Sequence, residues 1–406
     1  MQKLYQTSPL FIKLASITLF SKIGDRLFYT ALLSSAALLK DHNEAAVIIV
    51  SISETLPILL GFFIGSLADH YLDKLKALSQ TSFLRTLLYF MISLLFIHST
   101  TFTFILIVAW LNFCSDLLGN YVSALTAPFT KILVSKEQMQ QAQGFLSVST
   151  QLLNVLATFL GSFLLLFISQ SSLAFINALI FLVVALAFQK LKTKLTQYQA
   201  TLPVETEISL KQAIKQNFHT LYHHRTLFII LIQLTLLNGF FGGLSPLFSL
   251  FVKENEQLHW LPLPLKLALL SGLITGGMIV GSVSCKKILP ETTLSHLTLL
   301  ADLLALVTGI AFSTQNIYLI LGCSGLASFL LGVIAPRFSA QMINTFPVTQ
   351  IGGIVTIVNS LLVIMPPLTS LIFPLLFSLG LAYIALIFYG ALLVLLSLLT
   401  QNEAVT

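Results

Sequence analysis

The sequence predicts an all-α integral membrane protein with twelve transmembrane helices. Only 9% of its 406 residues are charged, against about 25% in a typical soluble domain, and its mean hydropathy is +0.93. Five long stretches contain no Asp, Glu, Lys or Arg: residues 86–115, 138–189, 226–252, 303–336 and 338–402. These stretches are continuously apolar rather than alternating, which favours helices over the strands of a membrane barrel.

The number of spans follows from the lengths of these stretches. A helix needs about 20 apolar residues to cross a bilayer. The stretch 138–189 therefore holds two spans, separated near Gln170, and the stretch 338–402 also holds two. Along the whole chain, the same criterion predicts spans at residues 11–39, 46–67, 79–98, 102–126, 142–168, 172–189, 226–251, 264–284, 294–313, 316–335, 351–374 and 379–400.

The basic residues predict the orientation of these spans. If the N-terminus is cytoplasmic, fifteen Lys and Arg fall in inside segments, and only Lys40, Lys253 and Lys266 fall outside. Because the inner loops of membrane proteins carry the excess of Lys and Arg, we expect both termini in the cytoplasm. The basic residues are spread over many short loops, so no nucleic-acid partner is expected.

The chain divides near its middle. The longest polar segment, residues 190–225, separates an N-terminal six-helix bundle, residues 1–189, from a C-terminal bundle, residues 226–406. Apolar residues of this linker recur at helical spacing, which predicts a short helix on the inner membrane surface. They are Leu210, Ile214, Phe218 and Leu221. A solvated linker is the alternative.

An internal repeat supports two parallel halves. The segment from Gly65 to Asp69 recurs 216 residues later, from Gly281 to Cys285. An Ala-Pro pair followed by Gly144 likewise matches an Ala-Pro pair followed by Gly352, 208 residues later. Two pairs of similar segments, in the same order and at similar offsets, indicate duplicated six-helix units.

The loop after the second span carries a recognisable motif. It reads Gly65-Ser-Leu-Ala-Asp69-His70-Tyr-Leu-Asp-Lys74. This loop resembles the Gly-x-x-x-Asp-Arg-x-Gly-x-Arg/Lys motif of the major facilitator superfamily, with His70 in place of Arg. The resemblance implies a gating loop that locks the outward-facing state, in which Gly65 permits close helix approach and Asp69 accepts bonds from a helix N-terminus or a basic group. Ordinary loop charges are the alternative for Asp69 and Lys74.

A narrower resemblance concerns the direction of transport. The stretch from Ala127 to Gly144 is similar to macrolide-efflux and enterobactin-exporter-like permeases, which implies export. The Gly-Pro antiporter motif of span 5 is reduced here to Gly161, and the Arg of span 4 is absent. The resemblance also implies that spans 1, 4, 7 and 10 line a central cavity.

Ionisable residues inside the spans are candidates for function, because each costs at least about 2.5–3.5 kcal/mol at the centre of a membrane helix. Span 1 carries Lys22, Asp25 and Arg26, span 2 carries Glu54, and span 4 carries Asp116. Asp25 and Asp116 are predicted at similar depths along their helices. We expect at least one of the three carboxylates to exchange protons during the transport cycle.

Three asparagines complete the candidate site for protons or substrate. Asn112 and Asn120 lie one helical turn to either side of Asp116 and form a polar stripe on span 4. Asn238 in span 7 lies among several glycines, which predicts a helix that can break at a gate or that only packs closely.

A purely structural network is the alternative for the charged residues. In it, Lys22 pairs with Asp25, and Arg26 reaches Asp116 or Glu54. Counting the three carboxylates against Lys22 and Arg26 leaves one excess negative charge, which favours a proton or a cationic substrate.

Two further charges, Arg85 in span 3 and Asp302 in span 9, are interpreted as structural residues close to the inner surface, where snorkelling or pairing would suffice.

Together these features predict a secondary active transporter driven by the proton motive force, with no cofactor, that exports a small amphiphilic compound by alternating access. Proton-coupled nutrient uptake is the alternative, since a fold does not set direction. A receptor or an enzyme is less favoured, because no catalytic or Walker motif occurs.

No metal site is expected, because the three cysteines lack Cys-x-x-Cys spacing. We expect a monomer in the bacterial cytoplasmic membrane, with the bilayer and a small-molecule solute as partners.

Overall fold

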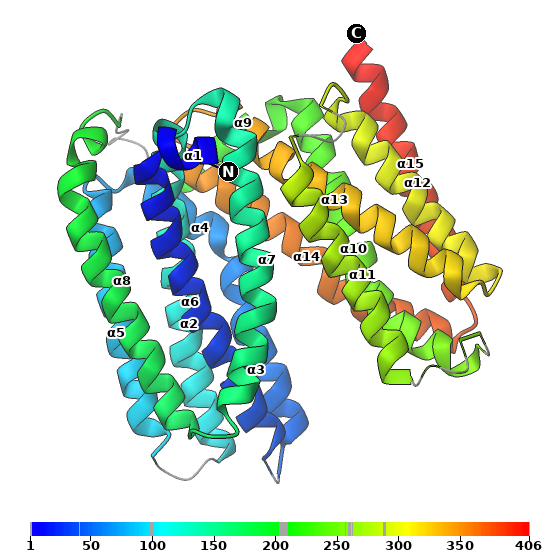
Figure 1. Ribbon diagram of the computed structural model, residues 1–406, viewed down its shortest axis with the longest axis horizontal. Coiled ribbons are helices and arrows are strands. Elements are labelled where there is room, and N and C mark those ends of the chain that lie inside the picture. Colours follow the sequence, from blue (N-terminus) through cyan, green and yellow to red (C-terminus); the bar gives the residue numbers. More distant parts are fainter. Residues whose placement is uncertain are drawn as a thin grey trace. The chain divides into compact units, whose positions relative to one another are not determined.

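The structure is a computed structural model that describes residues 2–39, 41–97, 101–202, 210–255, 257–258, 261, 263–286 and 290–405. All regular secondary structure in these ranges is helical (Figure 1). The elements are α1 (Gln2–Thr7), α2 (Pro9–Ala37), α3 (Asn43–Leu59), α4 (Gly61–His70), α5 (Lys74–Leu95), α6 (Phe102–Leu133), a 3-10 turn (Lys136–Gln138), α7 (Met139–Leu164), α8 (Gln170–Gln199), α9 (Leu210–His223), α10 (Arg225–Glu254), α11 (Leu263–Ser284), α12 (Leu294–Ser313), α13 (Ile317–Thr345), α14 (Ile351–Ser378) and α15 (Ala382–Val405).

Every predicted span lies on a helix, and the all-α membrane fold is confirmed. Ten helices in the described part of the chain are long and apolar enough to cross a bilayer, and α3 and α4, bent by 43° at their junction, form an eleventh span if they are counted together. The first predicted span corresponds to α2, which fails this composition criterion because Lys22, Asp25 and Arg26 interrupt it.

The spans differ from the prediction mainly at their inner ends. α6 continues to Leu133 and α13 to Thr345, beyond the predicted ends at 126 and 335. Each extension contains a proline, Pro128 or Pro336, inside the helix. Membrane helices tolerate such prolines because neighbouring groups satisfy the backbone bonds that a proline frees.

The chain forms two compact units. The first comprises Met1–Lys136, Ser149–His219 and Thr345–Ser360, and the second comprises Glu137–Val148, Thr220–Asn344 and Leu361–Thr406. The first residues of α7 therefore belong to the second unit, and the first residues of α14 belong to the first unit.

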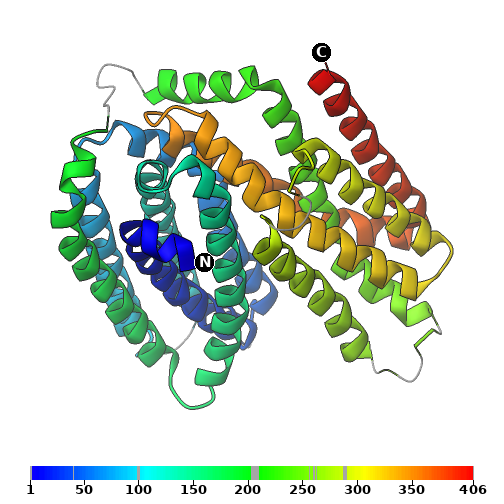
Figure 2. The same cartoon turned by 45° about the horizontal axis from the view of Figure 1, so that its top comes forward.

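The first unit is packed around α5 and α8, which lie side by side in both views (Figures 1 and 2). Its core holds stacked aromatic rings: Tyr89 lies parallel to Phe181 at 5.2 Å between centroids, and Phe28 meets Tyr89 edge-on at 4.9 Å. Such pairs stabilise a core beyond the burial of their apolar area.

The second unit is packed around α12 and α15, and glycines allow the helices to approach closely. A Cβ added at Gly390 would lie 2.5 Å from the Cα of Leu306. On α10, a Cβ at Gly242 would lie 2.6 Å from the Cα of Pro366 on α14. α10 is continuous from Arg225 to Glu254, so its glycines serve packing in this structure rather than a break.

The predicted linker helix is present as α9. Of its apolar stripe, Leu221 is buried and Phe218 is 39% exposed, and outside the stripe Ala213 is buried and Asn217 is 3% exposed. That the helix lies on the membrane surface stays a prediction. The side chain of Leu210 lies outside the described residues. Asn217 is buried because its amide donates a 3.2 Å hydrogen bond to the hydroxyl of Ser66 on α4, so a polar contact orients this helix.

Asp73 caps the first turn of α5, and removing its carboxylate should measurably lower the stability of the protein. Its carboxylate accepts from the backbone N–H of Lys76 at 3.0 Å, from Gln199 at 3.2 Å and from Lys192 at 3.1 Å. Burial raises the pKa of Asp73, but these three interactions outweigh it and leave the pKa below its ordinary value of 3.8. The stabilisation is therefore present above that value and is lost as the pH falls through the lowered pKa.

We expect Asp73→Ala to reduce the stability of the protein by about 1 kcal/mol, the usual value of an N-cap, as measured by thermal unfolding in detergent. Lys192→Ala serves as the control: it removes the exposed ion pair but keeps the cap, and should cost less. An equal loss in both variants would assign the effect to the ion pair.

Candidate functional site

A buried ion pair joins α2 to α5 in the first unit. The guanidinium of Arg85 contacts the carboxylate of Asp25, and its side chain is only 2% exposed. Arg85 also donates to Ser115 on α6 at 3.0 Å and to Ser21 on α2 at 3.2 Å. The ring of Phe181 lies 3.9 Å from the guanidinium carbon. A charge at this depth is stable only when it is paired and hydrogen-bonded in this way.

The local sequence of α6 leaves space for this guanidinium. Gly119 lies one turn from Ser115, and a Cβ at Gly119 would already come within 3.3 Å of an Arg85 nitrogen. A larger side chain would displace the arginine. The hydroxyl of Ser115 and the missing side chain of Gly119 together position Arg85 against α6.

A second ion pair joins α2 to α3. Arg26 contacts Glu54, and its Nε donates to the side-chain oxygen of Asn154 on α7 at 3.2 Å. One turn earlier on α2, the ammonium of Lys22 donates to Thr150 on α7 at 3.3 Å. These three helices thus share one line of polar contacts.

A chain of hydrogen bonds runs from α5 to Asp116. The hydroxyl of Tyr89 donates to Asn112 at 2.9 Å, and the amide of Asn112 donates to Asp116 at 2.9 Å. Asp25 and Arg85 lie close enough to interact electrostatically with Asp116. Among the described residues, no cation lies within ion-pair distance of Asp116, so its partner there is the neutral amide.

The structure therefore brings five of the predicted site residues together in the first unit: Asp25, Arg26, Glu54, Asn112 and Asp116. Asn120 lies half-buried one turn further along α6. Asn238 lies half-buried on α10 in the second unit, so its part in this site stays a prediction, as do the functional roles of all these residues.

One sequence interpretation needs correction. Lys22 contacts Thr150 rather than Asp25, and Asp25 contacts Arg85 instead. The pairing of Arg85 agrees with its interpretation as a structural residue. With Arg85 included, three carboxylates face three cations, so the expected excess negative charge disappears. The pairing of Arg26 with Glu54 agrees with the structural alternative.

Asp302, the other charge interpreted as structural, makes a polar contact inside the second unit. It is 0% exposed and accepts a 2.6 Å hydrogen bond from the hydroxyl of Ser397 on α15. That hydroxyl accepts in turn from Gln233 on α10 at 2.8 Å. Asp302 thus belongs to a buried polar cluster inside the second unit.

The polar residues of α7 were missed by sequence reasoning. Thr150 and Asn154 contact the charges of α2, and Thr158 follows at the same four-residue interval. This spacing places the three residues on one face of the helix, so the sequence alone could have predicted a polar face on α7.

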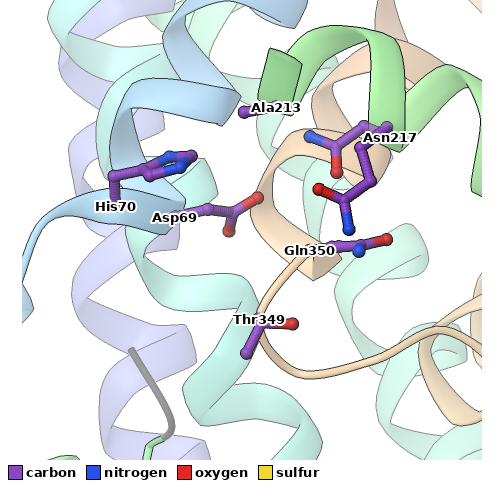
Figure 3. A pocket seen from close by; sticks show the side chains of 7 residues that line it. Asp69, His70, Ala213, Asn217, Thr349 and Gln350 are labelled. Carbon is purple, nitrogen blue, oxygen red and sulfur yellow. The ribbon is translucent and has the colours of Figure 1, made fainter. Parts of the chain in front are cut away.

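The predicted gating loop makes a defined contact with α14 in the first unit. The carboxylate of Asp69, at the end of α4 (labelled in Figure 3), accepts hydrogen bonds from the backbone N–H groups of Gly352 and Gly353. The two distances are 2.9 Å and 2.6 Å. An anion at a helix N-terminus satisfies free donors and the helix dipole together. This is the expected contact, which we call the Asp69 clamp, and its part in gating stays a prediction.

Gly65 and Lys74 support the Asp69 clamp. A Cβ at Gly65 would lie 1.8 Å from the hydroxyl of Thr356 and 2.9 Å from backbone atoms of α14, so only glycine permits this approach. The ammonium of Lys74 donates to the backbone carbonyls of Ala68 and Tyr71 at the end of α4. The last carbonyls of a helix have no partner within the helix, and the buried ammonium of Lys74 takes the place of water as their hydrogen-bond donor.

The repeat-equivalent position in the second unit lacks this charge. Cys285, which corresponds to Asp69, donates weakly through its thiol to the carbonyl of Gln140 on α7 at 3.6 Å. A Cβ at Gly144, which corresponds to Gly352, would lie 2.9 Å from that sulfur. The two repeats thus share the close helix approach but not the carboxylate.

Comparison with known proteins identifies the family. The model of the Major Facilitator Superfamily matches residues 14–365. The chain belongs to the major facilitator superfamily. It is therefore a membrane transporter of the alternating-access type rather than an enzyme. No curated protein matches this chain.

Several solved transporter structures share the fold. A bacterial homologue of the iron transporter ferroportin, outward-facing with soaked iron, has a TM-score of 0.74 at 16% identity and covers 97% of this chain and 98% of its own. The proton:xylose symporter XylE bound to 6-bromo-6-deoxy-D-glucose has a TM-score of 0.65 at 15% identity, with 98% and 96% covered. The human organic anion transporter MFSD10 (TETRAN) has a TM-score of 0.61 at 16% identity, with 96% and 99% covered.

Proposed function

We propose that this superfamily member is a proton-coupled exporter of a small amphiphilic solute, and that Asp116 is the carboxyl that exchanges the proton. The observation that carries this proposal is the unequal pairing within the first unit. Asp25 and Glu54 each contact an arginine, whereas Asp116 contacts only the neutral amide of Asn112. A carboxyl in a membrane helix without a cationic partner is best placed to take up a proton.

Arg85 gives this exchange a mechanism. It is paired with Asp25 and also acts on Asp116 through space. A shift of the guanidinium from Asp25 toward Asp116 would release a proton from Asp116 and leave Asp25 to take one up. Movement of α2 against α6 would thereby change which carboxyl is protonated.

The charge balance bears on the solute. Lys22, Arg26 and Arg85 match the three carboxylates, so the network has no net charge when all six groups are ionised. A solute of low net charge is compatible with this balance, whereas a strongly charged one would leave part of the network uncompensated. Among the described residues no three His, Cys, Asp or Glu side chains lie so that they could hold a metal ion together, so the iron soaked into the similar bacterial protein is not taken as a guide to the solute here.

Export as the direction rests on the resemblance of the stretch from Ala127 to Gly144 to efflux permeases. The bacterial cytoplasmic membrane as the location and a monomer as the working form are proposed on the same basis. Uptake on the same fold is the outcome that the experiment must be able to detect.

The test compares Asp116→Asn with the unaltered protein in proteoliposomes carrying a pH gradient. Nile red and ethidium serve as a neutral and a cationic fluorescent amphiphile. We expect the unaltered protein to move at least one dye against its concentration gradient until a protonophore is added. Asp116→Asn keeps the bond to Asn112 but cannot exchange a proton, so it should lose uphill movement while dye counterflow continues.

Asp41→Asn is the matched control, because it makes the same chemical change at an exposed position outside the spans. It should transport normally. Gradient-driven movement that survives in Asp116→Asn would rule out Asp116 as the proton site, and accumulation in the opposite direction would show uptake instead of export.

A further inference from the structure

One side of the linker helix α9 is packed against the first unit. Ala213 and Asn217 are buried on this side and line a polar pocket beside Asp69 (Figure 3). The amide of Asn217 also donates to the hydroxyl of Ser66 on α4 at 3.2 Å. These contacts come from protein alone, so they hold α9 on α4 whatever covers its other sides.

The neighbouring side of α9 is basic and exposed. Lys211, Lys215 and Phe218 are four and three residues apart, which places them on one side of the helix. All three side chains are exposed, and Phe218 is 39% exposed. No Asp or Glu occurs from Leu210 to Arg225, so the helix carries no negative side chain to offset the two lysines. A partner with negative charge complements this side.

Phe218 connects this basic side to the lipid-facing surface of α4. Its ring meets that of Phe62 on α4 edge-on, with 6.4 Å between centroids, and the rings of Phe62 and Phe63 are 4.0 Å apart. Phe63 is 43% exposed and lies in the second half of the span that α3 and α4 form. An exposed phenylalanine on a membrane span packs against lipid tails. The two lysines therefore lie beside a row of rings that leads into the bilayer.

We propose that Lys211 and Lys215 bind the phosphate groups of anionic phospholipids in the adjoining leaflet, with the ring of Phe218 inserted beside them. A lysine ammonium offers three donors to phosphate oxygens, and its flexible stem reaches from apolar surroundings to the level of the headgroups. Helices that combine lysines with an inserted aromatic side chain attach to anionic membrane surfaces in this way. This binding site is separate from the charged residues of α2, α3 and α6.

Hydrogen–deuterium exchange of α9 measures this binding. The full chain is placed in nanodiscs of phosphatidylcholine alone, or of phosphatidylcholine mixed with the anionic phosphatidylglycerol. We expect the backbone amides of residues 214–219 to exchange about five- to thirtyfold more slowly in the mixed lipid. Each lysine near an anionic surface contributes about a fivefold preference, and a helix held by lipid must release it before its amides open. The difference should shrink at high salt, which screens exposed charges.

The double variant Lys211→Gln with Lys215→Gln should exchange at the same rate in both lipids. Its matched control is Lys190→Gln with Lys194→Gln, which removes two exposed lysines at the same four-residue spacing on α8. The control should keep the full effect of lipid on α9. An equal loss in both double variants would show a general effect of net charge and would overturn the proposal. So would equal exchange of the unaltered chain in both lipids, which would show a helix side that meets only water.

Inorganic phosphate separates a lipid headgroup from a soluble anion. Added to nanodiscs of phosphatidylcholine alone, it should leave the exchange of α9 unchanged, and protection by free phosphate would contradict binding to lipid. The first turn of α8, capped by Ser169, is the internal reference and should exchange alike in all proteins. The comparison of the two lipids needs no variant and no transport, so its outcome is independent of the proposed function.

Discussion

Arg85→Leu is expected to destabilise the protein by about 3–5 kcal/mol, the usual cost of removing one partner from a buried ion pair. The substitution removes the cation that contacts the carboxylate of Asp25, and it removes the donor from which the hydroxyls of Ser21 and Ser115 accept. It also removes the guanidinium that packs on Phe181. Thermal unfolding of the purified protein in detergent measures the loss as a lowered midpoint.

The double variant Asp25→Asn with Arg85→Leu separates charge from packing. If the isolated carboxylate causes the loss, the double variant should regain much of the stability, because a neutral amide replaces the unpaired anion. Equal midpoints for the single and double variants would assign the loss to packing. Transport by the double variant should be impaired in either case, since Arg85 is the cation that the proposed mechanism moves.

Gly65→Leu is expected to separate α4 from the start of α14. Even the first atom of the new side chain would overlap the hydroxyl of Thr356 and press on the backbone of Gly352 and Gly353, which cannot rotate away. Overpacking of this kind costs about 1–3 kcal/mol or more. Deuterium exchange at Gly352 and Gly353 should rise steeply as the Asp69 clamp is lost, together with a lower unfolding midpoint.

Gly276→Leu is the matched control for this variant. Gly276 lies inside α11, and a Cβ there meets nothing within 4 Å. The same chemical change should therefore leave the unfolding midpoint and the exchange at Gly352 nearly unaltered. A normal exchange rate in Gly65→Leu would show that the contact between α4 and α14 tolerates a larger separation than this geometry allows.

The sequence predicted contacts well where a local motif carries its own chemistry. Asp69 was expected to accept bonds from a helix N-terminus, and it does so at Gly352 and Gly353. The polar stripe of Asn112 and Asp116 was also predictable, because both residues lie on one helix and their spacing sets their contact.

Pairing between helices was predicted less well. The structural alternative gave Arg26 either Asp116 or Glu54 as its partner, and the structure has Glu54. It gave Asp25 Lys22 as its partner, where the structure has Arg85. Lys22 lies three residues from Asp25 and was the obvious choice from spacing alone. Arg85 lies 60 residues away, and only the rotation of α5 within the first unit directs its side chain at α2.

The sequence by itself determined the helical membrane class, the positions of the spans and the family motif, because hydropathy and motifs are properties of the chain read in order. Only the tertiary structure decided which charges are neutralised. The partner of Arg85 and the lack of a cationic partner for Asp116 among the described residues each depend on how neighbouring helices are rotated and packed. In a low-dielectric interior a contact of a few ångströms decides whether a charge is stable there, and no spacing along the chain specifies that contact.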